Sequence, residues 1–469
     1  MSTDPFSKKK FWLQLLVQSG DKTYPIVPQG ELGKAEVQSL IESASRRMVP
    51  GFMKTVGIFT RVEIDRTPSI PGLPSRPDKR DFRGLQGELS REFEVRHVDI
   101  KEGVVPTDID VLIVSKPPVL TPKHQYAIDQ YLMGGGKVIF MTGTYHIKFE
   151  NGMMRPRRLD DTVFDLLKTY GVDIADSFVM DPRNLPFPLP VPKQRGRTQM
   201  NSIAYIPYPF FPAIRQEGFN QTNVIMKGLP SLAALWSSPI TLPTETNAEG
   251  QPKLDERGLP VIKKKPGIKA EYLAWSSPES WLRLDTRLEP DFRTFPEKGF
   301  GPPADAKPRS FPVAVSLVGT FESHFAGRAS PLFGERIRGE DALKADRTGR
   351  TIKVSTTDAR LLVVGSSEIA SDLAGNLAGQ MGGGAFRGNP QFIRNAIDWA
   401  LQNTDLLGIR SAGAFARTLK PLRSDERSRW EIGNYIVVLL ALVIVLVIGI
   451  TRRNLVKPIP LDQPKGEVS

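Results

Sequence analysis

An uncharged apolar run near the end of the chain constrains the fold most strongly. Residues Ile432–Ile450 read IGNYIVVLLALVIVLVIGI, and the nearest charges are Glu431 before them and Arg452 after them. At about 1.5 Å per helical residue the run spans roughly 28 Å, close to the ~30 Å hydrocarbon thickness of a bilayer. Trp430 and Tyr435 lie where aromatic rings favour the membrane interface. The run predicts one transmembrane helix, because a soluble domain has no use for a helix that is apolar on all sides.

Composition narrows the classes of protein that the chain can belong to. Its 469 residues carry a net charge of +12, but the basic residues are scattered apart from Lys8–Lys10 and Lys263–Lys265. Much of the excess charge lies near the apolar run, so a bilayer surface explains it better than nucleic acid does. Cysteine is absent, which excludes disulfides, thiolate nucleophiles and Cys-ligated zinc. This absence is compatible with an oxidising compartment but does not prove one.

Strands alternate with helices between residues 55 and 170. The expected strands are Thr55–Thr60, Glu94–Ile100, Asp110–Ser115 and Lys137–Met141, and the expected helices are Leu85–Phe93, Pro122–Met133 and Asp160–Tyr170. Thr121 precedes Pro122 as a helix cap, and Gly134–Gly136 follows Met133 as a helix stop. The alternation predicts βαβ units, and therefore an α/β fold with a parallel sheet flanked by helices.

Irregular, proline-rich insertions interrupt the chain from residue 183 onward. Residues 183–212 contain too many prolines for a packed helix. Residues 243–269 and 288–309 have the composition of polar linkers or flexible insertions. The segments expected to be structured are Tyr272–Leu284, the strands Phe311–Thr320 and Ala359–Gly365, and the helix Asn389–Gln402.

These elements predict an order of domains along the chain. Residues 11–18 and 22–28 are expected to form two strands around the turn Ser19–Asp21, followed by a helix over Glu31–Val49. The expected divisions are a partial leading β-hairpin and helix (1–50), an α/β domain (51–240), a structured segment with flexible linkers (241–310), the C-terminal part of the α/β region (311–410), a juxtamembrane linker (411–431), the transmembrane helix (432–450) and a short tail (451–469).

The residues best suited to chemistry lack the sequence context that catalysis requires. Ser366 stands between a strand and a helix, but Gly365-Ser366-Ser367-Glu368 lacks the second glycine of GxSxG, so Ser366 or Ser367 is interpreted as a helix cap. The histidines have no ligand spacing such as HExxH and are interpreted as structural. They are His97, His124, His146 and His324.

Two glycine runs and an acidic pair also have structural interpretations. Gly134–Gly136 precedes a strand and lacks the lysine of a phosphate-binding loop. Gly382–Gly384 is expected to form a flexible loop, and Asp160 and Asp161 fit a helix N-terminus, where carboxylates are favoured. We therefore assign no catalytic, cofactor-binding or metal-binding residue, and the sequence predicts a protein that is not an enzyme and needs no cofactor.

The segment 110–143 resembles the core of a known fold. The strand DVLIVSKPP leads into LTPKHQYAIDQYLMGGGKVIFMTG, in which a helix and Gly-Gly-Lys precede another strand. This arrangement is similar to the class I glutamine-amidotransferase-like fold. Members of that fold that are amidotransferases carry a cysteine nucleophile, so its absence here implies a non-catalytic relative.

Further segments, in order along nearly the whole chain, carry a second resemblance. They are DPFSKKKFWLQLLVQSGDK, AWSSPESWL, FPVAVSLVGTFESHF, ARLLVVGSSEIASD and GNPQFIRNAIDWALQNTDLLGIRS, followed by the apolar run. Together they resemble the GldG-like auxiliary proteins of gliding-motility-type ABC transporters. The resemblance implies an extracytoplasmic, periplasmic α/β domain anchored once in the inner (cytoplasmic) membrane, beside an ABC permease and its ATPase. It transfers no catalytic residue.

The start of the chain and the orientation of its anchor leave alternatives open. Members of that family usually begin with a membrane helix and a further α/β region, whereas this chain begins near the DPFS segment. Either a separate polypeptide supplies the upstream half, or the start is truncated. Basic residues flank the apolar run on both sides, including Arg429 and Arg452, so the positive-inside rule does not choose an orientation.

Three functions are compatible with these features. The first is a non-enzymatic, membrane-anchored auxiliary or substrate-binding-like subunit of an ABC transport complex, which contacts a permease and a cargo or envelope partner. The second is a membrane-tethered amidotransferase-like hydrolase, which requires a pocket that gathers groups such as His146 and Ser366. The third is a structural protein that binds an envelope polysaccharide or protein. None of them involves nucleic acid.

The terminal run generates a first prediction. Removal of Trp430–Ser469 should release the protein from membranes with its α/β domain folded. Arginine at both Leu440 and Val443 should act similarly, because each arginine costs about 2.5–3.5 kcal/mol at the centre of a membrane helix. Alkaline extraction of membrane fractions measures this, and a truncated chain that still resists extraction would show that another surface holds the membrane.

Overall fold

The computed structural model describes residues 15–19, 22–26, 53–63, 79–150, 153–195, 198–332, 351–381, 386–402 and 424–455. The chain forms two compact units, Met1–Phe415 and Ala416–Ser469. The expected helix at Glu31–Val49 and the glycine run Gly382–Gly384 lie outside the described residues. The leading hairpin lies within them: β1 (Leu15–Ser19) pairs antiparallel with β2 (Lys22–Ile26), as the sequence predicts.

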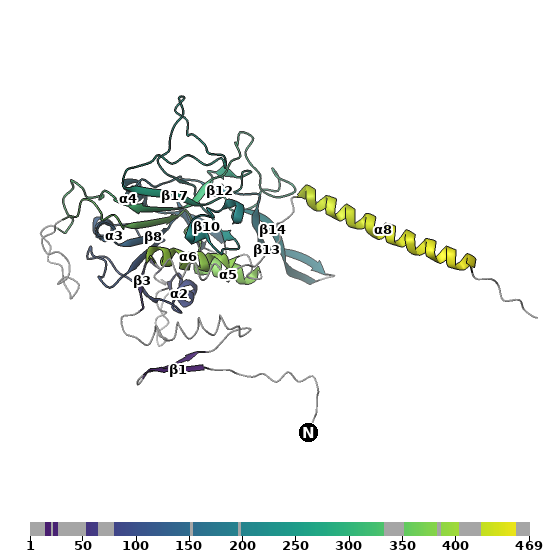
Figure 1. The fold of residues 1–469 in the computed structure, drawn as a ribbon, viewed down its shortest axis with the longest axis horizontal. Helices are drawn as coiled ribbons and strands as arrows, with labels where there is room; N and C mark the ends of the chain where they lie inside the picture. Colours follow the sequence, from purple (N-terminus) through teal and green to yellow (C-terminus); the bar gives the residue numbers. More distant parts are fainter. Residues whose placement is uncertain are drawn as a thin grey trace, which may run out of the picture. The chain divides into compact units, whose positions relative to one another are not determined.

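A seven-stranded sheet forms the centre of the first unit (Figure 1). Its strands, in spatial order, are β17 (Ile268–Trp275), β19 (Pro312–Gly319), β20 (Arg360–Val364), β8 (Lys137–Met141), β7 (Val111–Ser115), β3 (Thr55–Phe59) and β6 (Glu94–His97). The five strands from β20 to β6 run parallel to one another. The parallel α/β core that the alternation of elements predicts is therefore present.

The sheet is mixed rather than wholly parallel, which corrects the prediction. β19 runs antiparallel to both of its neighbours, β17 and β20. The reason lies in the connections, because neighbouring parallel strands need a crossover, usually a helix. Among the described residues, no helix lies between β17 and β19 or between β19 and β20. These strands therefore pair in opposite directions.

Helices cover both faces of the sheet. On one face, Val111 and Ile113 of β7 share a core with α2 (Arg83–Leu89) and α6 (Gly388–Ala400). On the other, Leu112 and Val114 share a core with α3 (Pro122–Met133) and α4 (Asp161–Thr169). Successive residues of a strand point to opposite faces, so a strand between two helical layers must be apolar throughout. All five residues of β7 are buried.

Capping residues determine where α3 and α4 begin and where α3 ends. The Thr121 side chain accepts a hydrogen bond from the His124 amide, and the His124 ring accepts one from the Thr121 amide, which completes a capping box. Gly134 is the C-cap of α3, and Gly135 follows with a φ of 86°, a conformation that favours glycine. Asp160 caps α4 through the amide of Thr162.

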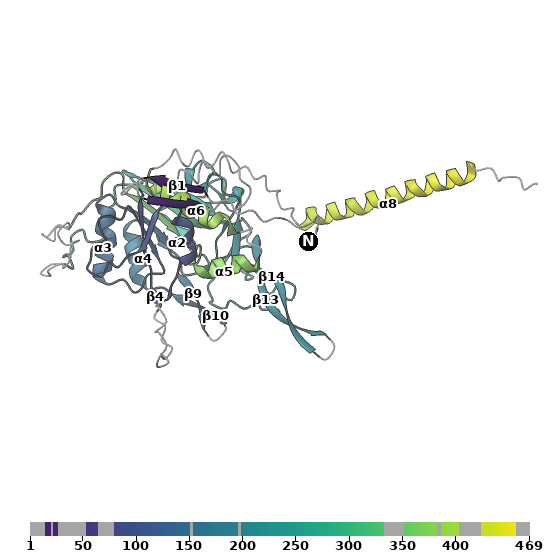
Figure 2. The ribbon, with the colours of Figure 1, turned by 90° about the horizontal axis from the view of Figure 1, so that it is seen from below.

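The proline-rich segment forms a β-hairpin rather than an irregular insertion. β13 (Asn184–Arg195) pairs antiparallel with β14 (Thr198–Ile214), and Figure 2 shows the two strands extending from the rest of the domain. Proline excludes a helix here, but an edge strand tolerates it because one side of an edge strand donates no ladder hydrogen bonds. The base of the hairpin joins an aromatic core that includes Tyr208, Phe210 and Trp236.

Shorter elements complete the first unit. They are β4 (Val62–Glu63), β5 (Lys79–Arg80), β9 (Tyr145–Glu150), β10 (Met153–Arg158), β11 (Asp173–Ile174), β12 (Phe178–Met180), the 3-10 turns η1 (Gln216–Gly218) and η2 (Val224–Met226), β15 (Leu232–Ala233), β16 (Ile240–Thr241), β18 (Trp281–Arg283) and α5 (Asp372–Gln380). Residues 288–309 contain no helix or strand, in agreement with the sequence.

The described part of the second unit is one long helix, α8 (Ser424–Leu455). It contains the whole apolar run. Its segment Arg429–Arg452 is long and apolar enough to cross a membrane.

The packing of the sheet generates a second prediction. Ile113 and Ile139 face each other on adjacent parallel strands, and both are fully buried. Truncation of either to alanine should cost about 2–5 kcal/mol of unfolding free energy. His124→Ala should cost far less, because it removes a capping contact at the start of α3 rather than a side chain of the apolar core. Thermal unfolding ranks the three variants, and equal losses would contradict this account of the core.

Candidate functional site

The parallel strands of the sheet end at a common edge, and this edge is where a site is expected. With β3, β6, β7, β8 and β20 numbered along the chain, their spatial order is 2-1-3-4-5. In open α/β sheets, ligands bind outside the carboxyl ends of the strands, where the strand order reverses. That reversal lies between β3 and β7. Lys116 directly follows β7, and Glu368 lies four residues after the end of β20.

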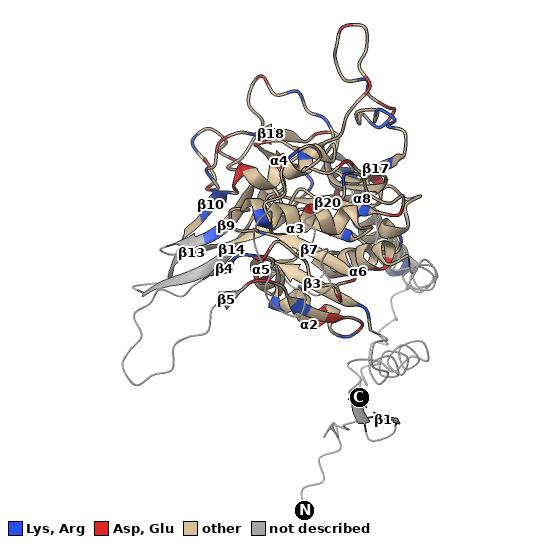
Figure 3. Ribbon diagram, turned by 90° about the vertical axis from the view of Figure 1, so that its left-hand side faces the viewer, with Lys and Arg blue, Asp and Glu red and all other residues tan. Residues whose placement is uncertain are grey.

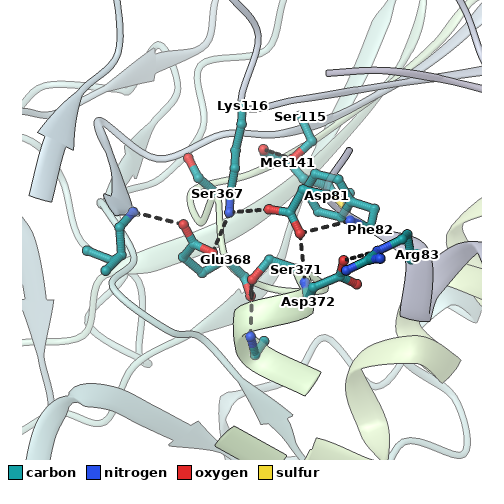
Figure 4. Close-up of polar contacts among 12 residues, drawn as sticks. Asp81, Phe82, Arg83, Ser115, Lys116, Met141, Ser367, Glu368, Ser371 and Asp372 are labelled. Atoms are coloured by element: carbon teal, nitrogen blue, oxygen red, sulfur yellow. Dashed lines mark hydrogen bonds and ion pairs between the residues drawn. The ribbon is translucent and has the colours of Figure 1, made fainter. Parts of the chain in front are cut away.

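An ion triad occupies this edge (Figure 4). The Lys116 ammonium lies 2.6 Å from a carboxylate oxygen of Asp81 and 2.6 Å from one of Glu368. The other Glu368 oxygen accepts a hydrogen bond of 2.9 Å from the amide of Ile147 in β9. The Glu368 side chain is fully buried, and that of Lys116 is 11% exposed. We call these three residues, Asp81, Lys116 and Glu368, the ion triad.

Local backbone geometry brings the triad together. Lys116 has a φ of 42° and Phe82 a φ of 71°, both in the left-handed region that side chains with a Cβ seldom adopt. These turns follow β7 and precede α2. One oxygen of Asp81 also accepts hydrogen bonds from the amides of Phe82 and Asp372. Asp81 therefore links the start of α2 to the start of α5.

Each charge in the triad stabilises the others. Burial by itself lowers the pKa of Lys116, but the carboxylates of Glu368 and Asp81 outweigh it and raise that pKa above its ordinary value. Burial raises the pKa of Asp81, and the Lys116 ammonium outweighs that effect and lowers it. Asp81 and Lys116 are thus both charged at neutral pH.

His146 lies in β9 near the triad and is kept neutral. Its side chain is buried, and burial together with the positive charges of Lys116 and Arg61 lowers its pKa to about 4. A protonated imidazole beside a buried ammonium would be repelled, so the ring stays uncharged at physiological pH.

A groove of about 730 Å³ opens beside the triad, between α2, α5 and the start of α6. Asp372 lies at its wall, where its carboxylate accepts hydrogen bonds from the Gly84 amide and the Arg83 guanidinium. Leu85, Ile369, Phe386 and other apolar side chains line the remainder. Asp81, Lys116 and Glu368 are not among the residues that line the groove.

Ser366 and Ser367, which the sequence predicts as helix caps, do not cap α5, and this corrects the prediction. Ser371 is the N-cap of α5 and accepts a hydrogen bond from the amide of Ala374. Ser366 is fully buried and donates a hydrogen bond of 2.6 Å to the carbonyl of Leu235. The Ser367 hydroxyl accepts one from the amide of Gly143. Ser366 and Ser367 thus fasten the loop after β20, and the helix begins later than expected.

The histidines of the sequence lie in separate elements. His97 is in β6, His124 in the capping box of α3 and His146 in β9. His324 lies in a loop, where its ring contacts the Thr169 hydroxyl at 2.7 Å. Within the described residues, no group of three or more His, Asp and Glu side chains could hold a metal ion.

No motif in the sequence predicts the ion triad. Lys116 lies 35 positions from Asp81 and 252 positions from Glu368 along the chain, so no local spacing reveals the triad. One signal was available: Lys116 and Glu368 each follow closely on a buried strand, where an apolar or small residue is commoner. In the view of Figure 3, acidic and basic residues are interspersed over the described elements, so charge patterning gives no further guidance.

The buried triad generates a third prediction. Lys116→Met would leave the Glu368 carboxylate without its cation, and the unfolding free energy should fall by about 3–5 kcal/mol. Lys101→Met is the matched control, because it removes an exposed ammonium paired with Asp99 and should hardly change stability. Urea unfolding measures both, and equal effects would contradict the buried role of Lys116.

His146 generates a fourth prediction, on pH. Its folded-state pKa of about 4 lies below the unfolded value of about 6.5. The neutral ring therefore stabilises the fold above pH 6.5, and this contribution, about 3 kcal/mol in full, is lost as the pH falls from 6.5 to 4. In urea unfolding at pH 7 and pH 4.5, His146→Gln should lose less stability on acidification than the wild type. An identical loss would show that the ring is already charged or exposed.

Comparison with known proteins places the chain in a family. Among curated proteins, none matches the sequence. A solved structure of a ThuA-like protein from Bacteroides uniformis aligns over 74% of this chain and 91% of its own, at 11% identity and a TM-score of 0.30, and at that score it supports no inference. A family model does match, over residues 54–401. The chain belongs to the family described as "ABC-type uncharacterized transport system", and is an auxiliary component of an ABC-type transport system.

Proposed function

We propose that this protein is a non-enzymatic auxiliary subunit of an ABC transport complex, anchored by α8 and working through its α/β domain. The observation that carries the proposal is the family match, which spans the α/β domain from β3 to the end of α6. In this proposal the subunit binds partner proteins and catalyses no reaction. Its domain is then a rigid body that binds a permease and a cargo or envelope partner.

The closed edge of the sheet supports a role without catalysis. The crevice at the carboxyl ends of the strands is where α/β enzymes place their reactive groups. Here the Lys116 ammonium is paired with the carboxylates of Asp81 and Glu368, and each oxygen of Glu368 has a partner. The Ser366 hydroxyl is buried and donates to a carbonyl, so it is not presented as a nucleophile. These contacts disfavour the hydrolase alternative.

The helix α8 supports a place beside a membrane-embedded partner. Its segment Arg429–Arg452 is long and apolar enough to span a bilayer. Gly433 and Gly449 lie near the ends of the apolar run, and small residues let another transmembrane helix approach closely. We propose that α8 packs against the permease. The large domain is then extracytoplasmic, and the tail after Arg452 faces the ATPase side of the membrane.

Further details of the proposal rest on the sequence resemblance. The GldG-like segments favour a gliding-motility-type transporter of the inner membrane. A glutamine-amidotransferase-like origin for the core would account for the helix and Gly-Gly-Lys that precede β8.

The fifth prediction tests the transport role. The full-length protein, extracted in mild detergent, should co-purify with a polytopic ABC permease and its ATPase, and the pure protein should show no hydrolase activity. The matched control is the chain with arginine at Leu440 and Val443, which should lose the permease. Reproducible capture of other envelope proteins, with no permease or ATPase, would replace the transporter role with a structural one.

A further inference from the structure

The two edges of the β13–β14 hairpin differ in their ability to pair with another strand. In an antiparallel pair, each strand turns alternate residues toward its partner. β13 carries a proline at every second position from Pro186 to Pro192, and each lies opposite a residue of β14. Proline has no N–H and cannot complete the ladder. The backbone nitrogen atoms of the prolines must therefore point away from β14, and the backbone N–H groups of Phe187, Leu189 and the alternate residues after them point toward it.

The outer edge of β13 is consequently almost without hydrogen-bond donors. Its outward residues from 186 to 194 are Pro186, Pro188, Pro190, Pro192 and Gln194. Only the last of these has an N–H to offer. Proline on an edge strand is a known protection against pairing with other chains. This edge of the hairpin is closed.

The outer edge of β14 has no such protection. The residues opposite the β13 prolines and Gln194 are Gln199, Asn201, Ile203, Tyr205 and Pro207. Four of these five carry an outward N–H. β15 pairs with β14 only at Ala213 and Ile214, so in the described structure residues 198–207 have no strand on this side. A row of backbone donors and acceptors is thus open to another strand.

We propose that a second copy of this chain pairs with the open edge, β14 against β14 of the partner, in an antiparallel arrangement about a two-fold axis. A two-fold axis places the N–H donors of one β14 edge opposite the C=O acceptors of the same edge in the second copy, so one sequence serves both sides of the contact. The inference does not depend on the transport role. It concerns only the hairpin, and it predicts a four-stranded sheet of order β13-β14-β14-β13.

The charge pattern supports this occupant and this direction. Thr198–Ile214 contains no charged residue, so two copies of β14 do not repel each other. The nearby positive charges are Lys193 and Arg195 in β13, and Arg197 follows them in the sequence. Antiparallel pairing keeps the two basic tips at opposite ends of the four-stranded sheet. Parallel pairing would bring them together.

The prolines also explain why such an assembly would stop at two copies. After pairing, both outer edges of the four-stranded sheet belong to β13 and lack donors. An unprotected edge would continue to recruit strands and aggregate. The uneven placement of proline on the two strands therefore defines a closed dimer.

Single cysteines provide the most direct test, because the natural chain contains none. In the full-length protein in mild detergent, we expect cysteine at one position between 199 and 205 to give a disulfide-linked dimer under mild oxidation, and the yield to fall on either side of it. Residues directly opposite in an antiparallel pair lie within the Cα separation that a disulfide spans. Pro188→Cys and Pro190→Cys, on the closed edge, should not cross-link.

Proline substitution provides the matched test of mechanism. Ile203→Pro removes an outward donor and leaves the β13 ladder intact, so the dissociation constant of the dimer should rise about tenfold or more in native mass spectrometry. Asn201→Pro should act in the same way. Pro190→Ala is the control on the other strand and should leave the dimer in place.

Three results would overturn the proposal. One is a monomeric wild-type protein. Another is a dimer that Ile203→Pro and Asn201→Pro leave unchanged, which would assign association to another surface such as α8. The third is cross-linking of the β14 cysteines to a different polypeptide, which would show that the edge receives a strand from a heterologous partner.

Discussion

The burial of the Glu368 carboxylate is the constraint on which the carboxyl edge of the sheet depends. A charge removed from water is tolerated only when it is paired and its remaining lone pairs are satisfied. Lys116 and the amide of Ile147 meet that requirement for Glu368. Because Lys116 is shared with Asp81, the loop after β20, the end of β7 and the start of α2 are held in one arrangement. The same contacts lie at the carboxyl edge of the sheet, where an α/β enzyme binds its substrate.

The position of the groove follows from this arrangement. Asp81 accepts the amide of Asp372, and the Asp372 carboxylate in turn accepts the amide of Gly84. These hydrogen bonds fix α2 and α5 next to each other outside the triad. A groove of about 730 Å³ lies between these helices.

Proline has opposite consequences in two structural contexts of this chain. It excludes a helix between residues 184 and 214, because an interior proline breaks the helical hydrogen-bond pattern. In β13 its regular spacing is compatible with a strand, since every proline lies on the side that needs no donor. β14 carries its prolines only from Pro207 onward, near the base of the hairpin. The same residue type thus determines both that the segment is extended and which of its edges is exposed.

Local sequence signals determined much of the fold. Thr121 and Pro122 set the start of α3, Gly134 and Gly135 set its end, and continuous apolar runs identified the buried strands, because each of these effects acts over a few residues. The apolar run in α8 likewise needed only its length and its lack of charge. Tertiary structure alone decided the reversal of β19, which depends on what connects the strands. It also decided the pairing of Lys116 with Glu368, which lie 252 positions apart, because a buried charge selects its partner by distance in space and not by spacing in the sequence.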